Sequence, residues 1–223
     1  MQGIYGEATA VHPYSQKAAI SLGWHECGAL LGFAPVGMHF RHIQQQQDQG
    51  RTSVIICFGV TNQPPARDIY PPHHHQSMIR RIYERLKMNR NLVAWTSAAP
   101  SPELPPTSRI DVRAYAGESW AFMNIVEFGA DLAELVEFRL KELCLRNINC
   151  IYIDLPLSHP ATQQFCASLE MLGFFFGAVI PELSNGDILR MQYLNNVEVR
   201  ADEIHTATDW GRELLYYVLR ARH

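Results

Sequence analysis

Two short segments with the pattern His-Pro-x-Ser/Thr-Gln hold the side chains best suited to chemistry in this chain. They begin at His12 and His159. An imidazole titrates near neutral pH, so either histidine could act as a general base or line a ligand cleft. The His-Pro pair could instead simply form a turn between a strand and a helix, with Ser15 or Thr162 as the helix N-cap. Both interpretations stay open, and the structural one is favoured because structural roles are commoner than catalytic ones.

A carboxylate at the end of an expected strand is a further candidate. Asp154 stands two residues before Pro156, at the end of an apolar stretch rich in β-formers. Open α/β sheets bind ligands at the ends of such strands. The carboxylate could therefore act as a base, or it could fix a loop as a hydrogen-bond acceptor.

Three consecutive histidines, residues 73–75, raise the question of a metal site. Consecutive side chains point in different directions on a regular backbone, and no Cys, Asp or Glu stands beside them at a ligand spacing. We therefore expect no metal. The sequence also lacks the G-x-S-x-G, Walker and G-x-G-x-x-G motifs, which argues against the common hydrolases, NTPases and dinucleotide-binding enzymes.

Composition narrows the class of protein. The 223 residues can form one large domain or two small ones with a sizeable core. A net charge of −3, a pI near 6.4 and the lack of a basic stripe argue against nucleic-acid binding. Five unclustered cysteines fit buried thiols in a reducing compartment. No apolar run is long enough for a membrane span and no signal peptide begins the chain, so we expect a cytoplasmic protein without a membrane partner.

Apolar periodicity predicts the elements that position these residues. The first part is expected to form a strand at 4–11, a helix at 15–22 closed by Gly23, and strands at 27–33 and 51–61 around a polar loop at 44–49. A proline-bracketed linker, a helix at 77–89 and an extended stretch at 100–106 should follow.

The rest of the chain reads as a hairpin followed by alternating helices and strands. We expect strands at 109–115 and 119–128, a helix at 131–145, a strand at 150–155, a helix at 162–172, a strand at 174–180, a turn at 184–186, a strand at 188–194 and a helix at 202–222. The strand–helix–strand stretch in the middle is a βαβ unit with a parallel pair.

This order, together with two Leu-Gly-aromatic elements, resembles the GNAT family of acyl-CoA-dependent N-acyltransferases. The elements are Ser21-Leu22-Gly23-Trp24 and Met171-Leu172-Gly173-Phe174. The resemblance implies an α/β fold with a mixed central sheet of GNAT type. Residues 4–61 resemble the C-terminal half of one unit, and residues 78–195 resemble most of a second. We therefore divide the chain into a half unit (1–63), a linker with an amphipathic helix (64–108) and a second unit with a C-terminal helix (109–223).

The resemblance also implies an activity, the transfer of an acyl group from acetyl-CoA or another acyl-CoA to an amine. It makes Glu127 a candidate base beside Asp154 and His159. Gly129 and Ala130 match the loop that holds the CoA pyrophosphate, and Gln163 could hydrogen-bond a pantetheine amide. That glutamine and its equivalent Gln16 could equally be exposed helix residues or part of a capping arrangement.

The chain departs from the family pattern at two places. The family loop Q/R-x-x-G-x-G/A appears here as a segment with one glycine and no Arg or Gln, residues 128–134. Asp131 stands where the anion would bind, and as a helix N-cap it would occupy the amides that a pyrophosphate needs. The tyrosine that reprotonates the thiolate in many members is replaced by Ala19 and Leu169, which cannot donate a proton.

Two functions therefore remain open. The chain could be an N-acyltransferase with a degenerate cofactor loop. Alternatively, it is a non-catalytic GNAT-fold module that senses a ligand or binds a protein within a larger bacterial regulatory protein, similar to paired modules that follow an anti-sigma-type ATPase domain. The early start of the first strand fits a missing N-terminal domain. The half unit has a free sheet edge, so we expect it to pair with the second unit or with another protomer.

Overall fold

The computed structural model describes residues 2–35, 50–94, 103–183 and 186–222. The strands are β1 (Gly3–Thr9), β2 (His25–Ala34), β3 (Thr52–Val60), β4 (Arg67–Ile69), β5 (Arg90–Leu92), β6 (Arg109–Tyr115), β7 (Trp120–Glu127), β8 (Cys150–Pro156), β9 (Phe175–Ile180) and β10 (Ile188–Leu194). The helices are α1 (Tyr14–Ser21), α2 (Gln76–Leu86), α3 (Leu132–Leu145), α4 (Ala161–Met171) and α5 (Asp209–Ala221), with 3-10 turns η1 (His73–His75) and η2 (Ala201–Glu203).

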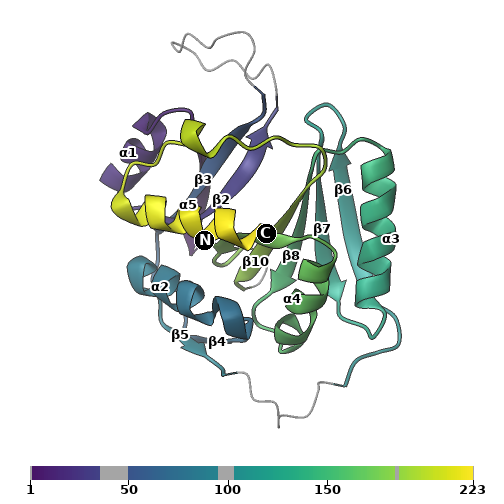
Figure 1. Ribbon diagram of the computed structural model, residues 1–223. Coiled ribbons are helices and arrows are strands. Elements are labelled where there is room, and N and C mark those ends of the chain that lie inside the picture. Colours follow the sequence, from purple (N-terminus) through teal and green to yellow (C-terminus); the bar gives the residue numbers. More distant parts are fainter. Residues whose placement is uncertain (1, 36–49, 95–102, 184–185, 223) are drawn as a thin grey trace.

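One mixed sheet of eight strands forms the centre of the molecule (Figure 1), in the order β1-β3-β2-β9-β10-β8-β7-β6. The expected α/β class with a mixed central sheet is confirmed. Within this sheet, β7 and β8 pair in parallel, joined by α3, as the predicted βαβ unit requires. The other pairings in the sheet are antiparallel, including the predicted β6–β7 hairpin.

The same connectivity occurs twice in this sheet. In the first βαββ segment (β1, α1, β2, β3), the last strand lies between the other two and is antiparallel to both. The second βαββ segment (β8, α4, β9, β10) has the same order and the same antiparallel pairing. The helices α1 and α4 also end alike. Gly23 and Gly173 adopt φ of +79° and +95°, and the amide after each donates to the carbonyl five residues earlier, a Schellman motif that confirms the predicted C-cap at Gly23.

The two βαββ segments join where β2 meets β9. The ladder between these strands consists of the pair Gly28 and Ala178. A Cβ at Gly28 would lie 2.2 Å from the Ala178 Cβ, so only glycine allows this approach. The buried side chain of Gln192 on β10 extends the junction. It donates to Ala29 O (2.9 Å) and accepts from Leu31 N (2.8 Å), and so takes the place of further strand pairing.

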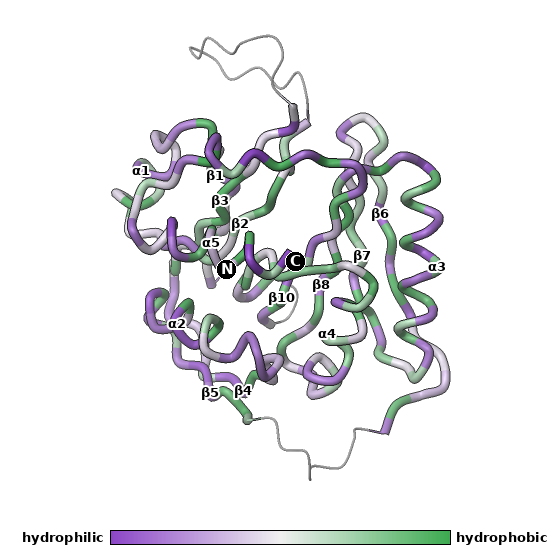
Figure 2. The backbone as a smooth tube through the Cα atoms, in the orientation of Figure 1, coloured by the Kyte–Doolittle hydropathy of each residue, from purple (hydrophilic) through white to green (hydrophobic). Residues whose placement is uncertain are grey.

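A layer of helices covers one face of the sheet. In Figure 1, α5, α2 and α4 cross in front of the strands. Met191 and Phe176 point to this layer, since they contact Cys166 of α4 and His75 of η1. Figure 2 shows hydrophobic and hydrophilic residues alternating along α3, as expected for a helix with one buried side.

The C-terminal helix starts later than the sequence predicts. Residues 201–203 form the separate turn η2, and α5 begins at Asp209. Thr208 sets this start because its Oγ1 accepts from Gly211 N at 2.8 Å, which makes Thr208 a true N-cap. The helix then packs over β2 and β9, across the junction of the two βαββ segments. Trp210 ties it to β2 by donating from Nε1 to Glu26 O (3.0 Å).

Residues 64–94, predicted as part of a linker with an amphipathic helix, form a folded insertion. It contains η1, the predicted amphipathic helix α2, and the short strands β4 and β5, which pair in parallel. Arg90 anchors the insertion by donating to Asp187 (2.6 Å) and Glu182 (2.8 Å) in the turn between β9 and β10. The side chains of Arg90 and Asp187 are fully buried, so loss of either one would leave the other as an unpaired buried charge.

Three predicted segments lie wholly or partly outside the described residues. They are the polar loop 44–49, the start of the extended stretch 100–106, and the turn 184–186. In the part of the chain that is described, no helix has both the length and the apolar character needed to cross a membrane.

Candidate functional site

The two histidines of the repeated motif form backbone turns. Nδ1 of His12 accepts from Tyr14 N (3.3 Å), and Nδ1 of His159 accepts from Ala161 N (3.2 Å). The same nitrogen thus binds the amide two residues ahead in both segments. Partial burial lowers the pKa of His159, whose ring stacks on Phe128 with centroids 4.6 Å apart. This geometry favours the structural interpretation of the motif.

The expected N-caps of the two helices are wrong. In α1, Ser15 Oγ is buried without a hydrogen-bond partner. In α4, Thr162 Oγ1 donates to Pro156 O (2.6 Å) instead of accepting from a helix amide. The histidine imidazole takes over the stabilisation of the turn in each case, which leaves the hydroxyl one residue inside the helix.

Gln16 fastens the first segment to the end of the chain. Its Nε2 donates to Thr9 O (3.0 Å) and His205 O (2.8 Å), and its Oε1 accepts from Ala207 N (2.8 Å). The side chain is fully buried. It satisfies three backbone groups and is no exposed helix residue.

Gln163, the expected contact to a pantetheine amide, has an equivalent role. Its Nε2 donates to Pro71 O (3.2 Å) and Val93 O (2.9 Å), both within the insertion and before and after α2. Both protons of the amide are therefore used within the chain. The two glutamines share a function, which is to tie the start of each helix to a distant backbone segment.

Asp154 lies in a buried ion pair. Both of its carboxylate oxygens accept from Arg190, at 2.8 and 2.7 Å, across the β8–β10 pair. The side chains are 7% and 5% exposed. Arg190 neighbours Met191, which faces the helices, so this pair lies on the opposite face of the sheet. A carboxylate held in this way is a structural acceptor and a poor candidate for a base.

The predicted catalytic residues do not come together in one site. Glu127 is exposed at the end of β7, opposite Arg109 in register. His159 starts α4 on the helix side, whereas Asp154 faces away from the helices. In the sequence, all three stand at or just after the end of a strand, which is why they were predicted to meet. Arg190, the partner of Asp154, was missed because the two lie 36 residues apart and only strand pairing brings them together.

A cavity opens where β7 and β8 separate. Their pairing ends at Asn124 and Asp154, although β7 continues to Glu127. The cavity has a volume of about 570 Å³. It is lined by Asp111, Arg113, Asn124, Ile125, Val126, Asp154, Pro156, Leu183 and Ile188.

This cavity carries charges of both signs. Arg113 donates to Asp111 at 3.0 Å on its exposed side, and Asp154 with its arginine partner forms the buried side. That arginine, Arg190, also lies over the Phe122 ring, 4.8 Å from its centroid. Because the charged groups are paired with one another, they are poor nucleophiles or bases. Together with the Asn124 amide, they are better suited to binding a polar ligand.

The start of α3 is covered by the chain segment before β6. Gly129 N donates to Ser108 Oγ (2.9 Å) and Ala130 N donates to Pro105 O (2.9 Å). A Cβ at Gly129 would lie 2.3 Å from the Thr107 carbonyl carbon. The two amides expected to hold a CoA pyrophosphate are thus already bonded and shielded from an incoming anion.

Asp131 contributes to this closure in an unexpected way. Its Oδ1 accepts from Ser108 N at 2.6 Å and makes no hydrogen bond to the first turn of α3. The predicted N-cap is therefore wrong, because the carboxylate fixes the covering segment instead of the helix amides. In this conformation, the residues at the start of α3 do not fit a pyrophosphate group.

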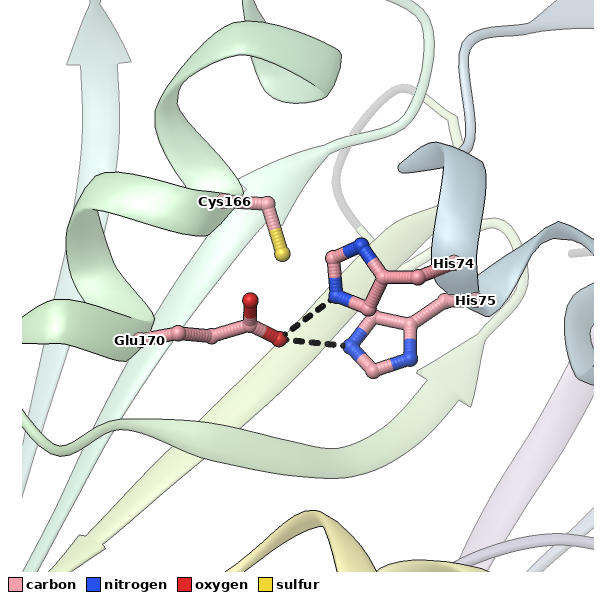
Figure 3. A group of neighbouring side chains, drawn as sticks. All are labelled: His74, His75, Cys166 and Glu170. Atoms are coloured by element: carbon pink, nitrogen blue, oxygen red, sulfur yellow. Dashed lines mark hydrogen bonds and ion pairs between the residues drawn. The ribbon is translucent and has the colours of Figure 1, made fainter.

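A separate cluster of metal-binding residue types lies between η1 and α4. Figure 3 shows His74, His75, Cys166 and Glu170 pointing toward one another. Nε2 of His74 and Nε2 of His75 lie 2.8 and 2.9 Å from the same oxygen, Glu170 Oε1. The potential ligand atoms all fall within 4.8 Å of one another.

The first premise behind the expectation of no metal is wrong, and the second holds for the local sequence only. The neighbouring histidines converge because their rings lie side by side, with centroids 4.1 Å apart. A cysteine and a glutamate do lie at ligand distance, supplied by α4 and not by the local sequence. Their four-residue spacing puts Cys166 and Glu170 on one face of a helix, and that spacing was the signal in the sequence.

The ionisation of this cluster reflects its burial. Burial raises the pKa of Glu170, but hydrogen bonds from the two histidines outweigh it and bring the value to about 2. The hydrogen bond to Glu170 raises the pKa of His74, while burial lowers that of His75. Burial also raises the pKa of the Cys166 thiol well above its usual range.

Comparison with known proteins yields little. No family model matches the chain, and no curated protein matches it. Among solved structures, it is similar to a mutant of the spermidine N-acetyltransferase SpeG from Vibrio cholerae, with a TM-score of 0.31 and 17% sequence identity. The alignment covers 36% of this chain and 53% of that one.

Proposed function

We propose that this chain is a GNAT-like binding module, in which the cavity at the open end of β7 and β8 takes a small ligand with an amide group. The covered start of α3 carries the proposal. The Gly129 and Ala130 amides are bonded to residues 105–108, so the pyrophosphate of an acyl-CoA finds no donors there. Asp154, paired with Arg190, gives no free base nearby.

The tandem arrangement is part of the proposal. The two βαββ segments share strand order, antiparallel pairing and helix ends, and β6 to β10 follow the element order that resembles GNAT proteins. A duplication of the C-terminal half of such a unit accounts for both observations. The first segment then completes the sheet beside β9 and needs no cofactor loop of its own.

The chemistry of the cavity supports an amide-bearing ligand. The edge of β7 beyond Asn124 and the edge of β8 beyond Asp154 face each other without pairing. Residues 125–127 of β7, which have left the ladder with β8, present N–H and C=O groups that can bind an extended amide as an added strand would. On the β8 side, Pro156 has no N–H and its carbonyl already accepts from Thr162 Oγ1. The Asn124 side chain offers another donor and acceptor at the same place.

A second candidate function is acyl-CoA:amine N-acyltransfer, and the open strand ends favour it. An acyl-pantetheine arm also carries amides, and the cavity has room for part of it. This function requires residues 105–108 to release Gly129 and Ala130. Glu127, exposed at the end of β7, is the base that this function would use.

Calorimetry with pantetheine, CoA and acetyl-CoA separates the two functions. We expect pantetheine and CoA to bind with equal affinity, because the pyrophosphate gains no contacts, and acetyl-CoA to show no turnover with a panel of amines. Asn124→Ala should weaken binding about tenfold, the loss of roughly one hydrogen bond. Asn91→Ala, which removes an exposed contact to Asp68 in the insertion, is the matched control.

Two results would contradict the binding module. If CoA binds far more tightly than pantetheine and acetyl-CoA is consumed with an amine, the chain is an acyltransferase. If pantetheine does not bind at millimolar concentration, the amide-bearing ligand is wrong.

The outer strand β1 is the place where we propose self-association. Ile4 and Tyr5 are exposed on it, and β1 ends the order of the eight-stranded sheet. An exposed edge of this kind is a template for pairing with a second copy. Light scattering should give a dimer that Tyr5→Lys converts to a monomer, and a monomeric wild type would overturn this part.

A further inference from the structure

We propose that His74, His75, Cys166 and Glu170 bind one zinc-type divalent metal ion, which joins the insertion to α4. This site is separate from the cavity between β7 and β8, on the helix side of the sheet. Its residues come from two elements far apart in the sequence, η1 and α4. The proposal rests on ligand types, distances, charge balance and the surrounding shell.

The ligand set and its dimensions suit a tetrahedral ion. Two imidazole nitrogens, a thiolate and a carboxylate are the groups that zinc prefers, at about 2.0–2.3 Å from the metal. Tetrahedral bonds of that length place the ligand atoms about 3.3–3.8 Å apart. The four atoms here lie within 4.8 Å of one another, so side-chain adjustments of about an ångström complete the site.

The charges of the group balance those of a divalent ion. Two neutral imidazoles, one thiolate and one carboxylate carry two negative charges, so the loaded centre is neutral, as a buried site requires. Cys166 gives up its thiol proton to the solvent when the metal binds. Cys166 and His75 are 0% and 3% exposed, whereas His74 is half exposed and provides the path of entry.

The surroundings provide an outer shell. His75 Nδ1 lies 2.6 Å from the Tyr217 hydroxyl on α5. With the metal on Nε2, Nδ1 carries the proton and donates it to the Tyr217 oxygen, which fixes the tautomer and the ring. Met191 Sδ lies 3.8 Å from the Cys166 sulfur, and the Phe176 ring packs edge-on against His75, so the inner side of the site is apolar.

Hydrogen bonds alone explain this cluster less completely. Two imidazole N–H groups can share Glu170 Oε1, as the distances of 2.8 and 2.9 Å show. That arrangement concentrates both donors on one oxygen and leaves the Cys166 thiol, a weak donor, with only the long contact to Met191 Sδ at 3.8 Å. An ion among the four atoms replaces the shared hydrogen bonds with one bond to each residue.

Cobalt(II) titration of the full chain, followed by displacement with zinc, tests the site. We expect one cobalt per chain, visible bands of tetrahedral cobalt and a near-ultraviolet thiolate-to-cobalt band. Cys166→Ser should remove the thiolate band, and His74→Gln should weaken binding at least tenfold. Tyr217→Phe, in the outer shell, should weaken binding about tenfold.

Two matched controls keep the test specific. His73→Gln changes the exposed neighbouring histidine, and Cys144→Ser changes a half-buried cysteine on α3. Both should bind cobalt as the wild type does. His74 is on the surface, so His74→Gln remains informative even if Cys166→Ser fails to fold. A wild type without a thiolate band at saturating cobalt, or a His74→Gln variant with unchanged affinity, would overturn the proposal.

Discussion

The two βαββ segments share their backbone geometry and differ in what their helices carry. Both helices follow a histidine turn, bind distant carbonyls through a glutamine, and end in a glycine with positive φ. Yet α1 has 8 residues and α4 has 11, an extra length of nearly one turn. Helix ends are set by a few local groups, so they persist while the surface between them changes.

The proposed metal ligands lie where the two segments differ. Counted from the glutamine of each motif, Ala19 occupies the place of Cys166, and counted back from the closing glycine of each helix, Ile20 occupies the place of Glu170. Neither can ligate through a side chain. The histidine turn, the glutamine and the closing glycine recur in both segments and shape the backbone. The residues that could bind a metal occur in the second segment only. In this protein, the repeated motif therefore marks residues with a structural role, and the positions at which the segments differ hold the residues suited to chemistry.

The largest effect is expected from a substitution that disrupts the junction between the two βαββ segments. Gly28→Val places side-chain atoms within 2.2 Å of Ala178, so β2 and β9 cannot pair. We expect the free energy of unfolding to fall by about 3 kcal/mol or more, since both strands are buried and rigid. Urea denaturation measures it. Gly117→Ala, where a Cβ meets no neighbour, should leave the midpoint unchanged, and a stable Gly28→Val variant would refute this view of the junction.

Substitution of Gln16 and Gln163 tests whether the two equivalent glutamines contribute equally to stability. Gln16→Ala unpairs three backbone groups in a fully buried place, whereas Gln163→Ala unpairs two in a half-buried one. We expect losses of about 2 and about 1 kcal/mol respectively. Thermal unfolding of both variants gives the difference. Equal losses would mean that the two glutamines contribute alike despite their different burial.

The smallest effect concerns the pH dependence of the ion pairs that join Glu182, after β9, to the insertion. Hydrogen bonding to Arg67 lowers the pKa of Glu182, and this carboxylate also accepts from Arg90. A lowered pKa stabilises the fold above the unfolded value of about 4.3, and that stability is lost as the pH falls through the folded value. The Tm advantage of wild type over Glu182→Gln should thus be full at pH 7 and shrink in acid. A constant advantage would exclude this linkage.

Sequence periodicity predicted most elements because each depends on nearby residues. Strand β6 at Arg109–Tyr115 has the predicted bounds, and α3 ends at Leu145 as predicted. The short strands β4 and β5 were missed because three residues show no alternation. The late start of α5 was missed because the Thr208 cap competes with an equally plausible start at residue 202.

The site was harder to predict because its contacts cross the sequence. The ion pair of Asp154 requires that β10 lie beside β8. The hydrogen bond that occupies the Gly129 amide requires that residues 105–108 fold back over it. The convergence of His75 with Glu170 depends on where the insertion packs. The local sequence pattern predicts which residues share one face of a helix or strand. Tertiary packing decides which of their polar groups are left without a hydrogen-bond partner.

The junction at Gly28 has a consequence for assembly. The backbone ladder between β2 and β9 has one pair, and the other contacts of β2 with the second segment come from side chains such as Gln192 and Cys150, so the first segment can leave its place with its own three-stranded pairing intact. Two molecules that exchange first segments would rebuild every contact of the junction between chains. The junction is thus a natural plane for domain swapping, in which the same interface serves one chain or joins two.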